Sequence, residues 1–161
     1  MPWYTGPTLQ AYLEEIDVDT AELEKGFSMP VQRVSRPDRT FRGFQGTVAT
    51  GRIAIGDPVK VLPSGTTSHV ARIVEGFDDV RQTSADHACS IVLEDEVDVS
   101  RGSVLASSYD PLVSNAFTVE MLWMDDAHLV PGKNFIFRIG TKSVPGTVLN
   151  IRYRINANTG E

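Results

Sequence analysis

The sequence predicts an all-β protein with two small β-barrel units in series, preceded by a short helix and a linker. From Met29 onward, short runs rich in Val, Ile, Thr and Phe alternate with Gly, Pro, Asp and Ser at intervals typical of all-β domains. Only one stretch, close to the N-terminus, has helical periodicity. With 161 residues, of which 41% are hydrophobic, the chain can bury one ordinary core or two small ones.

The helix and linker are expected within residues 1–26. Apolar side chains recur there at helical spacing behind a threonine placed to cap the first turn: Thr8, Leu9, Tyr12, Leu13 and Ile16. An acidic stretch without apolar periodicity follows and ends at Gly26-Phe27; its charges are Asp17, Asp19, Glu22 and Glu24. This composition predicts a linker.

The first barrel is expected within residues 27–109. Its predicted strands are 29–34, 42–54, 58–62, 67–75, 87–93 and 103–107. Turn-forming segments join them, namely Arg36-Pro37-Asp38, Ile55-Gly56-Asp57-Pro58 and Pro63-Ser64-Gly65. Six strands suffice for one small barrel or sandwich.

A second group of strands is expected within residues 110–161, at 116–124, 134–140 and 146–156, with the clearest alternation over 148–155. Three strands leave a sheet edge open, whereas a closed barrel removes its edges. We therefore expect this region to be the first part of a truncated barrel, and the chain to be cut at both ends. The alternative is that these strands extend the first barrel.

The composition of the chain argues against some classes of function. The net charge of -6 argues against a nucleic-acid partner, because such binding depends on Lys and Arg neutralising phosphates. The single cysteine, Cys89, lies in an apolar run and is expected to be buried. The sequence has no run of eighteen apolar residues and no signal-peptide pattern, so we expect a cytoplasmic protein without a membrane partner.

No catalytic, cofactor-binding or metal-binding residue is assigned within this chain. Gly140-Thr141-Lys142-Ser143 lacks both glycines of a phosphate-binding loop and is predicted to be a hairpin turn. His69, His87 and His128 are scattered and have no cysteine partner at ligand spacing. The acidic run Glu94, Asp95, Glu96 and Asp98 lacks the Gly and Glu of a calcium loop, so it is predicted to be a solvated hairpin tip.

The candidate contact residues surround a predicted loop that carries one acidic residue, Asp38. They are Arg33, Arg36, Arg39 and Arg42, together with the neighbouring Phe44. Guanidinium groups suit carboxylate partners, and loops on rigid barrels commonly carry binding functions. The loop is therefore a candidate for contact with a partner or neighbouring domain, and the alternative is a solvated loop.

Two strings resemble a known domain. Gly46-Thr47-Val48-Ala49-Thr50-Gly51-Arg52-Ile53, followed by Ile55-Gly56-Asp57 and Val59, resembles the second domain of elongation factor Tu and related translational GTPases. Ser100-Arg101-Gly102 with Val104-Leu105-Ala106 looks like the closing strand of the same domain. The resemblance implies an elongation factor Tu-like domain II barrel, followed by part of a domain III barrel.

Further strings are similar to the large GTPase subunit of bacterial sulfate adenylyltransferase. They are Trp3-Tyr4-Thr5-Gly6-Pro7-Thr8-Leu9, Arg42-Gly43-Phe44-Gln45-Gly46, Val119-Glu120-Met121-Leu122-Trp123-Met124, Pro131-Gly132, and Ile151-Arg152-Tyr153-Arg154 with Asn158-Thr159. Together they span most of the chain.

This resemblance implies a parent enzyme in which GTP hydrolysis is coupled to adenylyl transfer from ATP onto sulfate. GTP and Mg would bind the parent's own GTPase domain, which precedes this segment, and ATP would bind a separate small subunit in a heterodimer or larger assembly. No family catalytic residue maps to this chain, so the segment alone is expected to be non-catalytic. The alternatives are an RNA-binding barrel of an elongation-factor-like GTPase and a free-standing β-barrel interaction module.

Overall fold

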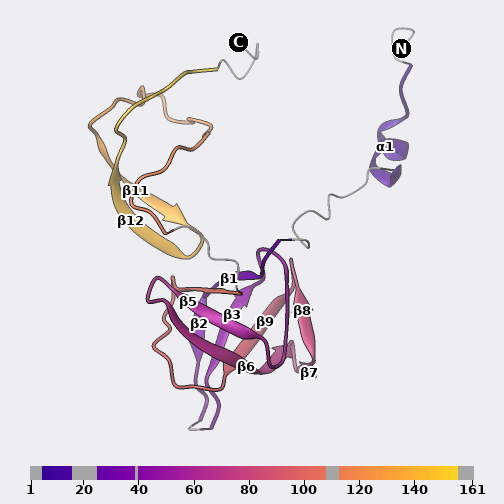
Figure 1. Cartoon of the computed structure of the whole chain (residues 1–161). Coiled ribbons are helices and arrows are strands. Elements are labelled where there is room, and N and C mark those ends of the chain that lie inside the picture. Colours follow the sequence, from indigo (N-terminus) through magenta and orange to yellow (C-terminus); the bar gives the residue numbers. More distant parts are fainter. Residues whose placement is uncertain (1–4, 16–24, 39, 108–112, 156–161) are drawn as a thin grey trace.

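The computed structural model describes residues 5–15, 25–38, 40–107 and 113–155, which form one short helix and twelve strands (Figure 1). The elements are α1 (Leu9–Glu15), β1 (Ser28–Pro30), β2 (Arg33–Ser35), β3 (Gly43–Thr47), β4 (Arg52–Ala54), β5 (Pro58–Leu62), β6 (Thr66–Glu75), β7 (Asp78–Val80), β8 (Gln82–Ser84), β9 (Ala88–Leu93), β10 (Val104–Ala106), β11 (Asn134–Ile139) and β12 (Lys142–Thr147). The all-β fold class is confirmed. No helix of the described residues has the length and apolar character needed to cross a bilayer.

The main sheet curls because its two edge strands are neighbours in the sequence. Its order is β1-β10-β5-β6-β9-β3-β2, with β7 paired to β6, and only Val31 and Gln32 separate edge strand β1 from edge strand β2. The three Cα–Cα steps from Pro30 to Arg33 span at most about 11 Å, so the sheet must roll up to bring its edges together. The Val31 N–H donates to the Ser103 carbonyl, and the Gln32 N–H donates to the Gln45 carbonyl, so this connection is bonded on both sides.

One continuous apolar core fills the curled sheet. Its largest fully buried side chains come from nearly every strand of the barrel and include Phe27, Met29, Phe44, Ile53, Ile73, Ile91 and Leu105. Cys89 is also buried, as predicted. Burying a side chain of this size contributes about 1.5–3 kcal/mol.

The barrel strands are shorter and more numerous than the sequence predicted. The expected strand 29–34 is divided into β1 and β2, and the expected strand 42–54 into β3 and β4. The second division falls at Gly51, whose φ of 70° lies in the left-handed region that interrupts a strand. Strands β7 and β8 were not predicted, because their polar sequences, DDV and QTS, carry no strand signal.

Two of the three strands predicted in the C-terminal part were wrong. β11 lies where it was expected, but no strand forms at 116–124, and the last described strand is β12 rather than 146–156. An alternating sequence becomes a strand only where a second chain segment satisfies its backbone groups. Among the described strands, β11 and β12 pair only with each other, so the alternative that they extend the first barrel was also wrong.

The predicted helix start and hairpin turn are confirmed. The Ala11 N–H donates to Thr8 Oγ1 over 3.2 Å, which is the expected capping bond of α1. Residues 140 and 141 form the two-residue turn between β11 and β12. The expected linker at 17–24 and Ile16 lie outside the described residues.

Candidate contact surface

The loop between β2 and β3, residues 36–42, carries most of the predicted contact residues. Asp38 shapes its tip, because one carboxylate oxygen, Oδ1, accepts from the Thr40 N–H, the Thr40 hydroxyl and the Phe41 N–H over 2.7–2.9 Å. These bonds, the Thr40 hydroxyl foremost, hold the pKa of Asp38 below its usual value. Asp38 therefore organises the loop rather than opposing the arginines.

The arginines do not converge on a single point. Arg36 pairs with Glu96 over 3.4 Å, and both side chains are more than half exposed. The Arg42 guanidinium lies 5.3 Å from the centroid of the Phe44 ring, within the range of a cation–π contact. Arg33 is exposed on β2, and neither Arg33 nor Arg42 forms an ion pair within the described part of the chain. Arg39 lies outside the described residues.

Phe44 requires a correction. Only 2% of its surface is exposed, and it belongs to the barrel core. Its predicted role as a direct contact residue is therefore wrong for this structure. Phe44 instead packs beneath Arg42 and supports that side chain.

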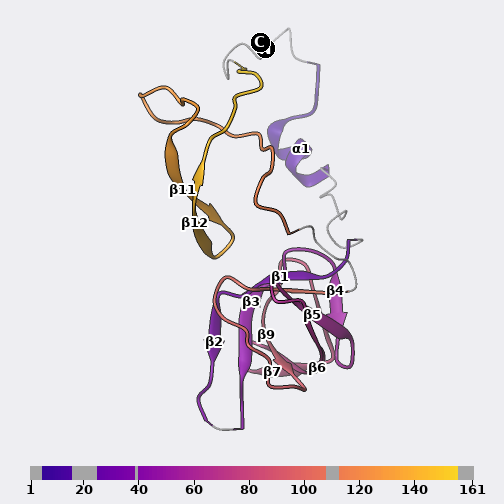
Figure 2. The ribbon, with the colours of Figure 1, turned by 60° about the vertical axis from the view of Figure 1, so that its left-hand side comes forward.

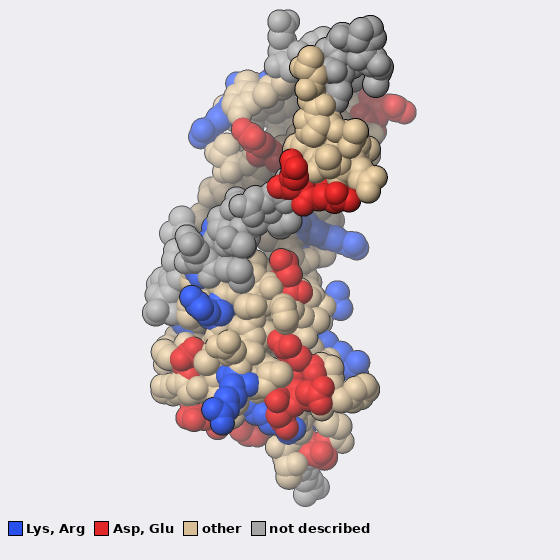
Figure 3. Space-filling model, turned by 90° about the vertical axis from the view of Figure 1, so that its right-hand side faces the viewer, with Lys and Arg blue, Asp and Glu red and all other residues tan. Residues whose placement is uncertain are grey.

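Sequence reasoning missed a neighbouring basic residue, Arg72, because it lies on β6, thirty residues after Arg42 in the chain. Arg72 lies over the ring of Phe41, 5.7 Å from its centroid, and forms a two-pronged bond with Asp79 of β7. This bond raises the pKa of Arg72 and lowers that of Asp79. Arg72 is therefore already neutralised by Asp79. On the face of the molecule drawn in Figure 3, basic and acidic side chains are interspersed in the same way.

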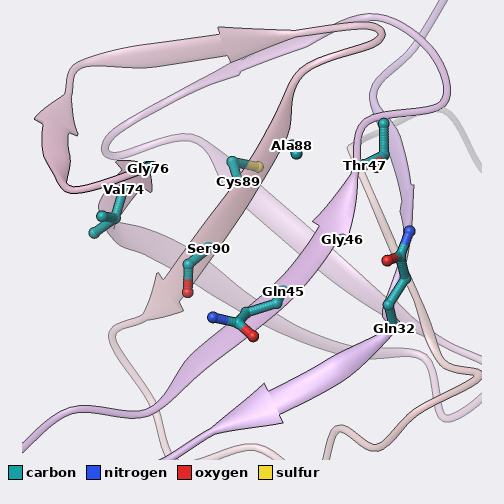
Figure 4. A pocket seen from close by; sticks show the side chains of 9 residues that line it. All are labelled: Gln32, Gln45, Gly46, Thr47, Val74, Gly76, Ala88, Cys89 and Ser90. Carbon is teal, nitrogen blue, oxygen red and sulfur yellow. The ribbon is translucent and has the colours of Figure 1, made fainter.

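A hollow of about 230 Å³ opens on the side of the barrel, over the paired strands β3 and β9 (Figure 4). Its lining is uncharged: Gln32, Gln45, Gly46, Thr47, Val74, Gly76, Ala88, Cys89 and Ser90. Sequence reasoning did not find it, because Gln32 and Gln45 become neighbours only through strand pairing. The two glutamine amides can both donate and accept hydrogen bonds, which suits an uncharged polar group.

Cys89 and Ser90, which both line the hollow, do not provide a nucleophile. Burial raises the pKa of the Cys89 thiol to about 11, so it is protonated at neutral pH and unreactive. Its Sγ lies 3.6 Å from the Met29 sulfur. The Ser90 Oγ is buried without a hydrogen-bond partner among the described residues, and no base is placed to activate it.

The histidines and acidic residues considered as metal ligands do not gather at one site in the described part of the chain. All three histidines are exposed, with His69 3.9 Å from Glu94 and His87 3.3 Å from Glu75. The acidic run 94–98 has exposed carboxylates, as expected, but it lies in the long connection from β9 to β10 rather than at a hairpin tip. No group of three metal-ligating side chains occurs within the described residues. Residues 140–143 lie in a β-hairpin, which does not fit a phosphate-binding loop.

Comparison with known proteins shows which families and proteins the chain is similar to. The family model described as GTP-eEF1A C-terminal domain-like matches residues 116–161. Sulfate adenylyltransferase subunit 1 of Saccharophagus degradans is 44% identical over 162 residues, which is 100% of this chain and 34% of that protein. The bifunctional enzyme CysN/CysC of Xylella fastidiosa is 43% identical over 162 residues, which is 100% of this chain and 26% of that protein.

The fold also matches solved structures. A crystal structure of sup35 complexed with GMPPNP superposes with a TM-score of 0.69 at 20% identity, covering 98% of this chain and 39% of that chain. The elongation factor Tu-like fold and the resemblance to the large-subunit family are both confirmed. The chain spans about one third of the first of these curated relatives and about one quarter of the second.

Proposed function

We propose that this chain, which belongs with the sulfate adenylyltransferase large subunits by similarity along its whole length, is the non-catalytic β-barrel part of such a subunit. The observation that carries this proposal is 44% identity over 100% of the chain to a curated subunit 1. The parent would couple GTP hydrolysis to transfer of an adenylyl group from ATP to sulfate, giving adenylyl sulfate and pyrophosphate.

In this proposal the reacting groups lie elsewhere in the assembly. GTP and Mg would bind the parent's GTPase domain, and ATP would bind a small partner subunit. The described residues support this division, because the buried thiol of Cys89 is protonated and the carboxylates of 94–98 are solvated. The barrel would instead contribute rigid surface to contacts between domains and subunits.

The β2–β3 loop is the proposed contact site on the barrel. Arg33 is exposed beside it, and Arg42 is held over Phe44, so two cations without an ion pair among the described residues frame the loop. Fixed guanidinium groups recognise carboxylates well. The expected partner surface is therefore acidic, on the GTPase domain or on the small subunit.

Charge reversal tests this site. We expect Arg36→Glu, Arg39→Glu and Arg42→Glu, combined in the full large subunit and assayed with the small subunit, to lower GTP-stimulated adenylyl transfer several-fold. Arg81→Glu is the control, because Arg81 is an exposed arginine of the barrel that lies between β7 and β8, away from the loop sequence. Thermal melting shows whether the triple variant is folded. Unchanged GTP stimulation in a folded triple variant would reject the contact site.

Residues 110–161 are proposed to be the first part of a second barrel. The support is the match of 116–161 to a C-terminal domain model, together with the large apolar side chains left exposed there. A longer chain, extended to the length of the curated relatives, should protect the amides of 148–155 from hydrogen exchange. Continued rapid hydrogen exchange of these amides in the longer chain would contradict the assignment of a second barrel.

RNA binding is the principal alternative function. The fold is similar to that of solved elongation factors, and the neutral hollow can accept an uncharged polar group. The net charge of -6 and the similarity to subunit 1 along the whole chain disfavour it. Retention of single-stranded RNA at moderate salt would favour this alternative over the sulfate-activating role.

A further inference from the structure

The turn of the β11–β12 hairpin lies against the barrel, beside the end of β1 (Figures 1 and 2). Gly140 and Thr141 form this two-residue turn, and Gly140 has a φ of 56°. A positive φ at the first turn position is typical of the tight turns that join two antiparallel strands. The turn therefore presents the Thr141 side chain in a defined position.

The Thr141 hydroxyl reaches a backbone acceptor far away in the sequence. Its Oγ1 donates to the Val31 carbonyl over 2.8 Å. The same carbonyl accepts from the Gly102 N–H over 3.0 Å, so both of its lone pairs are used. Val31 is itself fully buried, and its N–H is bonded to the Ser103 carbonyl. The acceptor is thus held rigidly by the barrel before the hairpin adds its bond.

Two glycines lie where the two surfaces come into contact around this bond. A Cβ placed on Gly102, whose φ is 93°, would lie 3.4 Å from the Lys142 Cβ. A Cβ placed on Gly140 would lie 3.5 Å from the Cβ of Pro30. Gly102 belongs to the barrel and Gly140 to the hairpin, so each surface has a glycine where the other comes close.

We propose that these groups form a joint that fixes the orientation of the C-terminal hairpin on the barrel, with Thr141 as its positioning residue. The Thr141–Val31 hydrogen bond joins 25–107 to 113–155 across 110 positions of sequence. The bond is partly buried, which strengthens it relative to an exposed one. Barrel and hairpin then present one continuous rigid surface to any partner.

Residual dipolar couplings measured on the 161-residue chain test this joint. In the unaltered chain, one alignment tensor should fit the amides of both the barrel strands and β11–β12. Thr141→Val keeps the branched shape but removes the donor. The ratio of docked to undocked hairpin should then fall by roughly 2- to 10-fold. The barrel strands and the β11–β12 hairpin should then need separate alignment tensors.

Two further variants make the result specific. Thr141→Ser keeps a hydroxyl and should preserve the common tensor. Thr147→Val removes a hydroxyl from the same hairpin, where Thr147 bonds Asn134 over 2.5 Å, and should also preserve it. Cross-strand contacts between β11 and β12 show whether each variant keeps the hairpin. Separate tensors in the unaltered chain, or a common tensor in Thr141→Val, would overturn the proposal.

Discussion

The barrel and the C-terminal segment contain similar apolar side chains but use them differently. Ile91 of β9 is fully buried, whereas Ile136 of β11 is 70% exposed. β9 is paired on both sides, by β3 and β6, while β11 has β12 as its single partner in the part of the chain that the structure describes. The comparison teaches that apolar alternation specifies a strand's faces, and that neighbouring strands decide whether the apolar face becomes a core.

The largest expected effect comes from truncating the same residue type in the two regions. Ile91→Ala should lower the free energy of unfolding of the barrel by about 2–5 kcal/mol, because it opens a cavity in a closed core. Ile136→Ala, the matched control, should change it by less than about 0.5 kcal/mol, because its side chain is already in solvent. Denaturant unfolding monitored on barrel amides measures both. Equal losses of unfolding free energy for the two substitutions would contradict the difference in burial between the two regions.

A smaller difference is expected at two strand glycines. A Cβ on Gly43 would lie 2.2 Å from the Ser90 Oγ and 2.7 Å from the Phe41 ring, inside the barrel wall. Gly43→Ala should therefore destabilise the barrel by about 1–3 kcal/mol. A Cβ on Gly146 would meet the Phe137 ring at 2.9 Å, but that ring is half-exposed and can rotate away.

Gly146→Ala should accordingly leave the barrel's unfolding midpoint unchanged and alter only the hairpin. Thermal unfolding followed separately by barrel and hairpin resonances distinguishes the two. If Gly43→Ala lowers the unfolding midpoint of the barrel no more than Gly146→Ala lowers that of the hairpin, the barrel wall is not closely packed.

The smallest effect concerns pH and tests how well the C-terminal segment holds together. The Tyr153 hydroxyl donates to Glu120 Oε1 over 2.7 Å, and this bond with the carboxylate charge raises the pKa of Tyr153 above 10.0. A raised folded-state pKa means that the bond's stabilisation is complete below the unfolded value and is lost as pH rises through the folded value.

Ultraviolet titration of the tyrosines measures this shift. Glu120→Gln removes the charge and should return the pKa of Tyr153 towards its ordinary value. An ordinary pKa for Tyr153 in the unaltered chain would indicate that segments 116–124 and 148–155 do not stay together.

The sequence predicted the barrel better than its contact surface. β5, β6, β9 and β10 lie where alternation and turn residues placed them, because each has partner strands that satisfy its backbone. The strand expected at 146–156 failed because its alternating pattern does not supply such a partner. At the contact surface, the one-dimensional spacing of the arginines was visible in the sequence.

The groups that modify those arginines came from distant segments and were not visible. Glu96 pairs with Arg36 across sixty positions, and Phe44 carries Arg42 from within the core. The hollow beside Gln45 depends on the register of β3 against β9, which no local pattern specifies. Tertiary pairing therefore decided which predicted residues are available for contact.

The most direct test of the proposed role is a calorimetric titration of the 161-residue chain into the sulfate adenylyltransferase small subunit from the same source. A barrel that serves subunit contacts should bind saturably at one site without added nucleotide, and Arg42→Glu should weaken that binding. Absence of binding under conditions where the complete large subunit binds would contradict the role proposed for this barrel.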